Sequence, residues 1–302
     1  MISKKKITAV VIAVLMMCTM LVGCGSSSTA PGSSASGSAA TESAQDSKDS
    51  VLNTKVLRVG MECGYAPYNW TQSDDSNGAV KIHGTNDYAN GYDVMMAKKI
   101  CEANGWELEV VRLDWDSLVP AVQTGQIDAV IAGQSMTPER MEQVDFAGPY
   151  LYATIVCLAL EGSQYAAATN INDLAGGKCT SQLGTIWYDT CLPQIEGAQI
   201  QPAKESAPAM LMALETGDVD FVCTDMPTAQ AATLAYPDMV LLDFAGSDAD
   251  FTVDESDINI GISLMKGDTV LKDAIDAVLA PMGADAFNAM MADAIAIQPV
   301  GE

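Results

Sequence analysis

Histidine is almost absent from this chain of 302 residues, and His83 is the one example. A Ser-His-Asp triad and a histidine-based metal site would both depend on that one side chain, so the sequence argues against both. No C-x-x-C pair occurs, so neither a zinc site nor thioredoxin-like chemistry is indicated. The acidic residues 248–257 lack the spacing and the glycine of an EF-hand loop. We therefore expect no metal and no cofactor.

Basic residues are also scarce. The chain has 15 Lys and Arg against 39 Asp and Glu, for a net charge of −24. A field of this sign repels phosphate groups, so it argues against binding to nucleic acid and against direct binding to anionic lipid. It does not exclude a small anionic group at a local cationic site.

Long apolar runs are absent after the first 23 residues, which predict an export signal. Lysines 4–6 precede an apolar stretch that ends near Met20, and residues 21–24 (LVGC) resemble the lipobox of bacterial lipoprotein precursors. That resemblance implies diacylation of Cys24 on the outer face of the cytoplasmic membrane. An ordinary signal peptide and an N-terminal membrane anchor are the alternatives, although the run is short for a spanning helix.

The next segment is expected to be a flexible tether. Residues 25–50 are rich in Ser, Gly, Ala and Thr, so they cannot bury enough apolar surface to fold. Residues 24–53 would therefore link the lipid to a folded body that begins near Asn53. Six cysteines fall in that body, and Cys179 and Cys191, which flank one predicted turn, are the candidate disulfide pair. Free buried thiols are the alternative.

Strand and helix signals alternate through the body, which predicts an α/β fold with mainly parallel sheets. Ligands of such folds lie beyond the carboxyl ends of strands. We expect strands at residues 55–60, 106–113, 127–132, 178–182, 219–223 and 259–265, and helices at 93–103, 116–124, 185–191, 207–215, 227–234 and 269–279.

Arg140 is the first candidate for a ligand contact. Thr137, Pro138 and Glu139 predict the start of a helix, which places Arg140 in the first turn, where the helix dipole disfavours a cation. A guanidinium beside free backbone N–H groups suits a small carboxylate held bidentately. An arginine that reaches solvent or pairs with a nearby glutamate is the alternative.

A second candidate follows from an internal similarity. Residues 124–131 (TGQIDAVI) resemble residues 216–223 (TGDVDFVC), which suggests two related lobes that each offer a strand end to a common cleft. The first segment leads to Arg140 and the second to Asp225. A cation and an anion across one cleft suit a zwitterion, whereas an N-cap for the next helix is the alternative role of Asp225.

Seven motifs in this order resemble the extracytoplasmic solute-binding proteins, family 3, of polar amino acid ABC transporters. They lie at residues 64–68 (GYAPY), 91–94 (GYDV), 114–120 (DWDSLVP), 125–133 (GQIDAVIAG), 135–140 (SMTPER), 144–150 (VDFAGPY) and 217–225 (GDVDFVCTD). The resemblance implies a two-lobed, periplasmic-binding-protein-like fold of type II, with two crossover segments. Lobe 1 would comprise residues 54–152 and 255–302, and lobe 2 residues 153–254.

The resemblance also implies roles for site residues. Arg140, Ser135 and Gly133 would bind the α-carboxylate of an amino acid, and Asp225 would bind its α-ammonium. Backbone N–H groups of the loop at Thr185 and Ile186 would add to the carboxylate site, although the family usually has a hydroxyl residue in place of Ile186. The side-chain pocket would be lined by Tyr65, Trp115 and Glu62, the last favouring a basic ligand unless it is simply solvated.

These observations predict a monomeric, non-enzymatic receptor that delivers a basic or polar amino acid to an ABC transporter permease. Two alternatives remain at this point. A sensor subunit would need a separate signalling partner, because the chain carries no signalling domain. A cyclohexadienyl-type dehydratase on the same fold would need an acid and a base in the cleft, and Glu62 or Asp225 would have to serve, because no spare lysine or histidine is evident.

Overall fold

A computed structural model describes residues 50–299, which all belong to one compact unit of the chain, residues 42–302. The predicted export signal, Cys24 and nearly all of the tether lie outside the described residues. Within residues 50–299 no helix is both long enough and apolar enough to cross a membrane.

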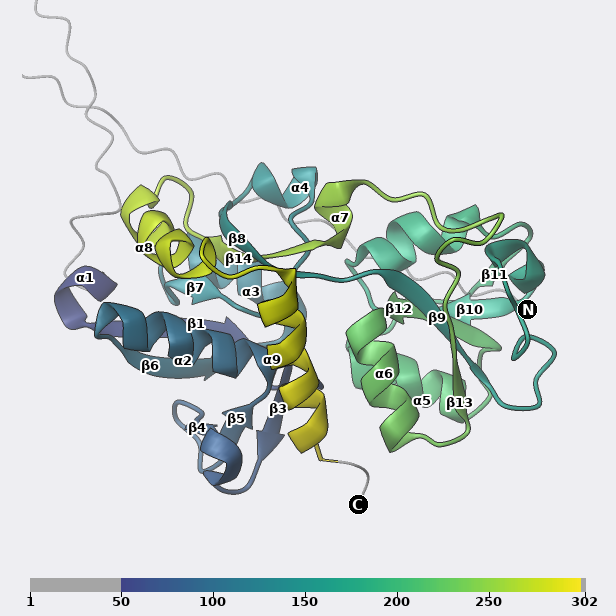
Figure 1. The fold of residues 1–302 in the computed structure, drawn as a ribbon, viewed down its shortest axis with the longest axis horizontal. Coiled ribbons are helices and arrows are strands. Elements are labelled where there is room, and N and C mark those ends of the chain that lie inside the picture. Colours follow the sequence, from purple (N-terminus) through teal and green to yellow (C-terminus); the bar gives the residue numbers. More distant parts are fainter. Residues whose placement is uncertain (1–49, 300–302) are drawn as a thin grey trace, which may run out of the picture. The chain divides into compact units, whose positions relative to one another are not determined.

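The first large sheet has five strands in the order β6-β1-β7-β14-β8 (Figure 1). Helix α2 packs against α8 and α9, and α3 packs against β1. The strands are β1 (Val56–Met61), β6 (Glu107–Arg112), β7 (Ala129–Val130), β8 (Asp145–Tyr152) and β14 (Asn259–Leu264). The helices of this part are α1 (Val51–Thr54), α2 (Tyr92–Asn104), α3 (Trp115–Gln123), α4 (Pro138–Met141), α7 (Glu255–Ile258), α8 (Thr269–Leu279) and α9 (Ala284–Ile297).

The second large sheet has the order β11-β10-β12-β9-β13. Its strands are β9 (Ile155–Leu160), β10 (Lys178–Thr180), β11 (Gln199–Ile200), β12 (Phe221–Asp225) and β13 (Met239–Leu242). Its α-helices are α5 (Ala207–Glu215) and α6 (Met226–Ala235), and shorter 3₁₀ and π turns lie at Ile171–Leu174, Trp187–Cys191 and Leu192–Gln194. The helix predicted at 185–191 is thus a π-helical turn that begins two residues later.

The segment from 64 to 90 forms a small antiparallel sheet of its own, β2-β3-β5-β4, beside a 3₁₀ turn at Ser76–Gly78. Its strands are β2 (Gly64–Tyr65), β3 (Asn69–Gln72), β4 (Val80–Lys81) and β5 (Tyr88–Asn90). The long polar stretch between residues 71 and 90 is therefore built into the fold, where β4 packs against β6.

Both large sheets are mixed, so the prediction of mainly parallel sheets was wrong. In the first sheet β1 pairs in parallel with β6 and β7, whereas β14 pairs antiparallel with β7 and β8. In the second sheet β12 pairs in parallel with β10 but antiparallel with β9. In each sheet one strand runs against the other four, β14 in the first and β9 in the second, and each is the first strand after a connection between the sheets. We call each large sheet with its helices a lobe, and keep 152/153 and 254/255 as the proposed boundaries.

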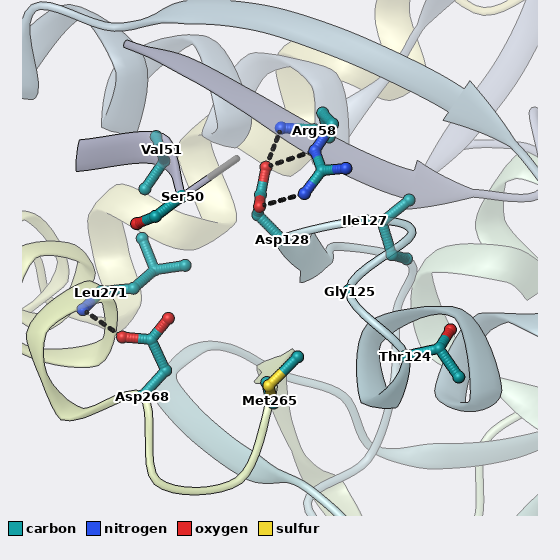
Figure 2. A pocket seen from close by; sticks show the side chains of 10 residues that line it. All are labelled: Ser50, Val51, Arg58, Thr124, Gly125, Ile127, Asp128, Met265, Asp268 and Leu271. Atoms are coloured by element: carbon teal, nitrogen blue, oxygen red, sulfur yellow. Dashed lines mark hydrogen bonds and ion pairs between the residues drawn. The ribbon is translucent and has the colours of Figure 1, made fainter. Parts of the chain in front are cut away.

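The internal similarity corresponds to one structural unit used twice. Asp128 Oδ2 accepts the backbone N–H of Arg58 at 2.8 Å in the first lobe, and Asp220 Oδ2 accepts that of Lys178 at 2.8 Å in the second. In both lobes the carboxylate therefore fixes the neighbouring parallel strand. In the first lobe the guanidinium of Arg58 adds two bonds to Asp128, at 3.0 and 2.7 Å, beside a cavity of about 250 Å³ (Figure 2). None of the predicted ligand residues lines that cavity.

The six cysteines of the described residues are all buried free thiols, so the predicted pair of Cys179 and Cys191 is not formed. Cys157 and Cys223 are directly opposite each other on β9 and β12. Cys157 and Cys223 fill apolar positions in the second lobe, as small hydrophobic side chains do. Within residues 50–299 no group of three or more His, Cys, Asp or Glu side chains is arranged to hold a metal ion.

Candidate functional site

Asp225 occupies the junction between β12 and α6, and its carboxylate is almost fully buried. Oδ1 accepts the backbone N–H of Thr228 at 2.9 Å, which makes Asp225 the N-cap of α6. Oδ2 accepts two phenolic hydroxyls from the first lobe, Tyr68 at 2.8 Å and Tyr65 at 3.2 Å. Burial raises the pKa of Asp225, and these hydrogen bonds oppose the rise. The capping role and a ligand role are compatible, because they use different acceptor positions.

Arg140 is a partly buried cation at the same interface between lobes. Its guanidinium donates to two backbone carbonyl oxygens, Ser135 at 2.9 Å and Gly184 of the second lobe at 2.9 Å. Its Cζ lies 5.2 Å from the ring centroid of Trp115, a cation–π contact. Burial lowers the pKa of Arg140 to about 10, although nearby acidic residues raise it. No carboxylate of the described residues forms a salt bridge with Arg140, so the guanidinium keeps donors for an anion.

Seven of the nine predicted ligand residues line one cavity between the lobes. Its lining is Tyr65, Trp115, Gly133, Ser135, Arg140, Gln182, Thr185, Ile186 and Trp187. Asp225 joins this group through the hydroxyl of Tyr65. The cavity measures about 10 Å³, roughly the space of one water molecule. The two lobes are therefore closed on each other.

Gly133 is held at this cavity by a buried network. Its N–H donates to Tyr150 Oη at 3.0 Å, and Tyr150 donates to Asp93 Oδ1 at 2.6 Å. Asn69 Nδ2 donates to Asp93 Oδ2 at 2.8 Å. The φ of Gly133 is +65°, and an added Cβ would lie 2.9 Å from Tyr65 Cε1, so a larger residue does not fit. Burial raises the pKa of Asp93 to about 6.

Gln134 has no part in the cavity. Its Oε1 accepts the hydroxyl of Ser263 at 2.6 Å, and its backbone carbonyl accepts the N–H of Gly261 at 2.9 Å. Both partners lie on β14, so Gln134 connects the ligand loop to the first sheet. This polar residue stands at an otherwise apolar position because a buried hydroxyl faces it.

A larger, acidic cavity adjoins the first, and Trp115 lines both. It measures about 560 Å³ and is lined by Glu62, Gly64, Leu113, Asp114, Trp115, Asp116, Ser117, Leu183, Glu205, Ser206 and Pro208. Four of these residues carry a carboxylate and none is Lys or Arg. The lining comes from both lobes, so this cavity also depends on closure.

Glu62 lines the larger cavity and contacts Gln182, which lines the smaller one. Its Oε1 accepts Gln182 Nε2 at 3.4 Å, while its buried Oε2 has no hydrogen-bond partner. Burial is the main cause that raises its pKa to about 7, and the charges of Asp93, Asp114 and Asp116 add to the effect. An incoming cation would offset this cost, because an opposite charge favours the ionised carboxylate. The structure thus gives Glu62 an environment unlike that of a solvated surface glutamate.

Sequence reasoning missed three residues of this interface: Tyr68, Gln182 and Trp187. Tyr68 stands in the 64–68 motif, but its spacing from Tyr65 gave no sign that both hydroxyls would reach Asp225. Gln182 and Trp187 flank the loop at Thr185 and Ile186. Their polar and aromatic side chains next to a predicted ligand loop were the available signal.

The sequence profile of the bacterial extracellular solute-binding proteins, family 3, matches residues 57–293. The chain belongs to this family. Family 3 proteins are binding proteins, so the prediction that the chain is not an enzyme is confirmed and the dehydratase alternative is set aside.

Several relatives of this family 3 protein are named for the compound that they bind, among them the following two. A probable histidine-binding protein of Campylobacter jejuni subsp. jejuni serotype O:2 is 31% identical over 200 residues, which cover 66% of this chain and 72% of the relative. The arginine-binding extracellular protein ArtP of Bacillus subtilis is 32% identical over 132 residues, which cover 44% of this chain and 46% of ArtP.

A solved structure confirms the fold of this family 3 protein. The solved structure is that of an amino acid ABC transporter substrate-binding protein of Streptococcus pneumoniae Canada MDR_19A bound to L-arginine. The TM-score is 0.70 at 23% identity, with 83% of this chain and 98% of that chain covered. The predicted two-lobed α/β fold of the type II periplasmic binding proteins is thereby confirmed, with mixed rather than mainly parallel sheets.

Proposed function

We propose that this chain is the receptor of an ABC importer and binds an L-amino acid with a cationic side chain between its two lobes. The observation that carries the proposal is that two opposite charges, the buried Asp225 and the partly buried Arg140, lie at one interface. Arg140 lines the small cavity, and Asp225 is bonded to Tyr65 of the same lining. A zwitterion satisfies both groups at once, whereas a sugar or a simple anion satisfies at most one.

Each predicted residue takes a definite role in this proposal. Arg140 binds the α-carboxylate bidentately, together with Ser135, Gly133 and the backbone of Thr185 and Ile186. Asp225 binds the α-ammonium. Tyr65 and Trp115 are the aromatic walls against which the aliphatic part of the ligand packs.

The acidic cavity supports a cationic side chain on the ligand. Glu62 has an unpaired buried oxygen, and Asp114, Asp116 and Glu205 line the same space without a basic residue. A second carboxylate on the ligand would be repelled there. The names of the two relatives, a probable histidine-binding protein and an arginine-binding protein, point the same way.

Ligand binding in this proposal is coupled to movement of the lobes. A cavity of about 10 Å³ does not admit an amino acid, so the lobes open before the ligand enters and close afterwards. Closure is stabilised by contacts that cross the interface, including Arg140 to Gly184 and Gln182 to Glu62. Recognition of the closed form by a permease would then restrict delivery to the loaded receptor.

A thermal-shift screen with isothermal titration calorimetry tests the ligand class. L-Arginine, L-histidine, L-lysine and L-ornithine are compared with L-glutamine, L-glutamate and L-cystine. A ligand at about 100 times its Kd stabilises the protein by about 2.7 kcal/mol, which gives a clear shift in Tm. Tight binding by cationic amino acids alone supports the proposal. Tighter binding of L-glutamate or L-cystine would contradict the role of Glu62, and no binding of any amino acid would contradict the function.

We further propose that diacylated Cys24 and the 24–53 tether hold the receptor at the outer face of the membrane. The lipobox at residues 21–24 supports this, and a tether of this composition reaches roughly 30 Å. Fractionation of cells that express the parent chain or Cys24→Ala tests the anchor. The parent should sediment with membranes and the variant should not. Equal distributions of the two proteins would contradict lipidation.

A further inference from the structure

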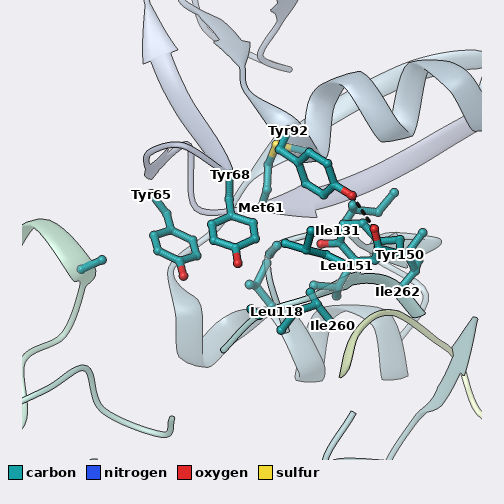
Figure 3. Packing of buried hydrophobic residues seen from close by; sticks show 14 of the residues in the cluster. Met61, Tyr65, Tyr68, Tyr92, Leu118, Ile131, Tyr150, Leu151, Ile260 and Ile262 are labelled. Atoms are coloured by element: carbon teal, nitrogen blue, oxygen red, sulfur yellow. Dashed lines mark hydrogen bonds between the residues drawn. The ribbon is translucent and has the colours of Figure 1, made fainter. Parts of the chain in front are cut away.

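Tyr68 has a place in this interface that its sequence motif did not reveal. The residue is fully buried between β2 and β3, and its hydroxyl donates to Asp225 across the lobe interface at 2.8 Å. Its ring stacks on Tyr65 with centroids 4.7 Å apart and meets Tyr92 edge-on at 6.3 Å. Figure 3 shows the rings of Tyr65, Tyr68 and Tyr92 in series.

The acceptor positions of Asp225 are nearly all used in the closed form. A carboxylate has about four of them. Oδ1 accepts the N–H of Thr228, and Oδ2 accepts both phenols. One position therefore remains, and it lies on Oδ1. An α-ammonium that reaches Asp225 without displacing a phenol meets that oxygen.

The phenol of Tyr68 is poorly able to yield to a ligand. Its ring is held between two other rings, and a Cβ on Gly133 would lie only 3.2 Å from its Cδ1. A tyrosine side chain has only two main torsions, and packing fixes both. The hydroxyl of Tyr65 is bound less tightly, because it lies 3.2 Å from Asp225 and also accepts a bond from Thr228 Oγ1 at 3.1 Å.

We infer that Tyr68 is a positioning residue for ligand recognition, which on closure fixes the Asp225 carboxylate so that Oδ1 faces the ligand α-ammonium. This inference rests on the proposed function. The Asp225 carboxylate then has two separate tasks. The N–H of Thr228 and the hydroxyl of Tyr68 hold it in place from two sides, and the remaining lone pair of Oδ1 binds the ligand α-ammonium. The packed ring brings the hydroxyl to the same point at each closure.

A comparison of paired ligands tests the inference. The tightest-binding amino acid of the screen is titrated beside its des-amino analogue, 5-guanidinopentanoate for L-arginine or 3-(imidazol-4-yl)propanoate for L-histidine. The ratio of the two Kd values measures recognition of the α-ammonium alone. Tyr68→Phe keeps the packed ring and deletes the hydroxyl, and we expect it to reduce this ratio about tenfold, the scale of one hydrogen bond to a charged group.

Tyr92→Phe is the matched control, because it removes a hydroxyl from the adjacent ring. The Tyr92 hydroxyl donates to the carbonyl of Tyr150 and does not contact Asp225. This variant should leave the ratio unchanged even if both Kd values or the Tm shift. Equal loss of the ratio in both variants would show a general effect of packing and overturn the inference.

The remaining outcomes are also decisive. An unchanged ratio in Tyr68→Phe overturns the inference while the proposed function stands. A Tyr68→Phe protein that fails to fold would assign the hydroxyl to stability and overturn it as well. If no amino acid binds the parent protein, the proposed function itself is wrong and the inference falls with it.

Discussion

Tyr150 donates its hydroxyl to Asp93 at 2.6 Å and accepts the N–H of Gly133 on the same oxygen. The two bonds tie a buried carboxylate of α2 to the loop where the ligand carboxylate is proposed to bind. Tyr150 lies on β8, which β14 separates from β7, so the loop is tied to a second strand of the same sheet as well as to its own strand. Such a network rigidifies a site only when every polar group in it has a partner.

Tyr150→Phe is expected to destabilise the protein by about 2–3 kcal/mol, because it leaves the N–H of Gly133 and one oxygen of Asp93 without partners. Urea unfolding measures the change. Tyr152→Phe is the control, since that ring is 46% exposed on the same strand and should change stability little. Equal effects of the two variants would argue against the network.

Arg140→Ala is expected to weaken binding of the cationic amino acid more than about 100-fold, because the ligand carboxylate loses its charged, bidentate partner. Calorimetry measures the loss, and circular dichroism checks that the fold is retained. Arg112→Ala removes the same charge from an exposed position on β6 and should bind like the parent. Undiminished binding by Arg140→Ala would show that the carboxylate site is elsewhere.

Asp225→Asn is expected to abolish recognition of the α-ammonium with little loss of stability. An asparagine still caps α6 by accepting the N–H of Thr228, but it carries no charge for the ligand. The control is Asp220→Asn, the same change at the exposed start of the same segment. We expect a reduction in affinity of at least about 100-fold for Asp225→Asn and less than twofold for the control. Equal affinities of the two variants would contradict the assignment.

The raised pKa of Glu62 predicts that ligand affinity depends on pH. Its pKa is raised to about 7, and a cationic ligand favours the ionised form, so affinity should increase as the pH rises through 7. L-Arginine stays charged in this range, and its Kd should decrease about tenfold between pH 6 and pH 8. Glu62→Gln should bind more weakly at pH 8 and lose this dependence. Asp93, with a pKa near 6, titrates in both proteins.

The raised pKa of Glu62 has the opposite effect on the stability of the protein without ligand, which should decrease as the pH rises. Because the pKa of Glu62 is higher in the folded protein than its usual 4.5, the stability that the protonated group contributes is complete below pH 4.5. It is lost as the pH rises through 7. Glu62→Gln should therefore increase the free energy of unfolding relative to the parent at pH 8.5 but not at pH 4. A constant difference across this range would show that Glu62 is not buried on folding.

Much of the local structure was predictable because it depends on near neighbours in the chain. Thr137 accepts the N–H of Arg140, Asp225 accepts that of Thr228, and Gly105 ends α2 in the left-handed region. These are contacts across three or four residues. The prediction for the 185–191 helix was less accurate, because a π-helical turn differs from an α-helix by one residue per turn and leaves no periodic pattern in so short a segment.

Strand direction was not predictable in the same way. Parallel neighbours follow from an intervening helix, as in β1 and β6, and the sequence showed that alternation. The reversed strands are β9 and β14, which are the first strands after the two connections between the lobes. Their direction depends on where the chain crosses, which is a long-range property.

The sequence by itself determined the family, the two related lobes and the two charged residues of the proposed site. These features were predictable because motif order, helix caps and strand ends depend on short stretches of the chain. Only the tertiary structure placed Tyr68 on Asp225, Gln134 on Ser263, and Glu62 in an acidic cavity between the lobes. The partners in the first two pairs are more than 120 residues apart, and the cavity is lined by both lobes. The folding of the lobes against each other brings these groups together, and no local pattern encodes that contact.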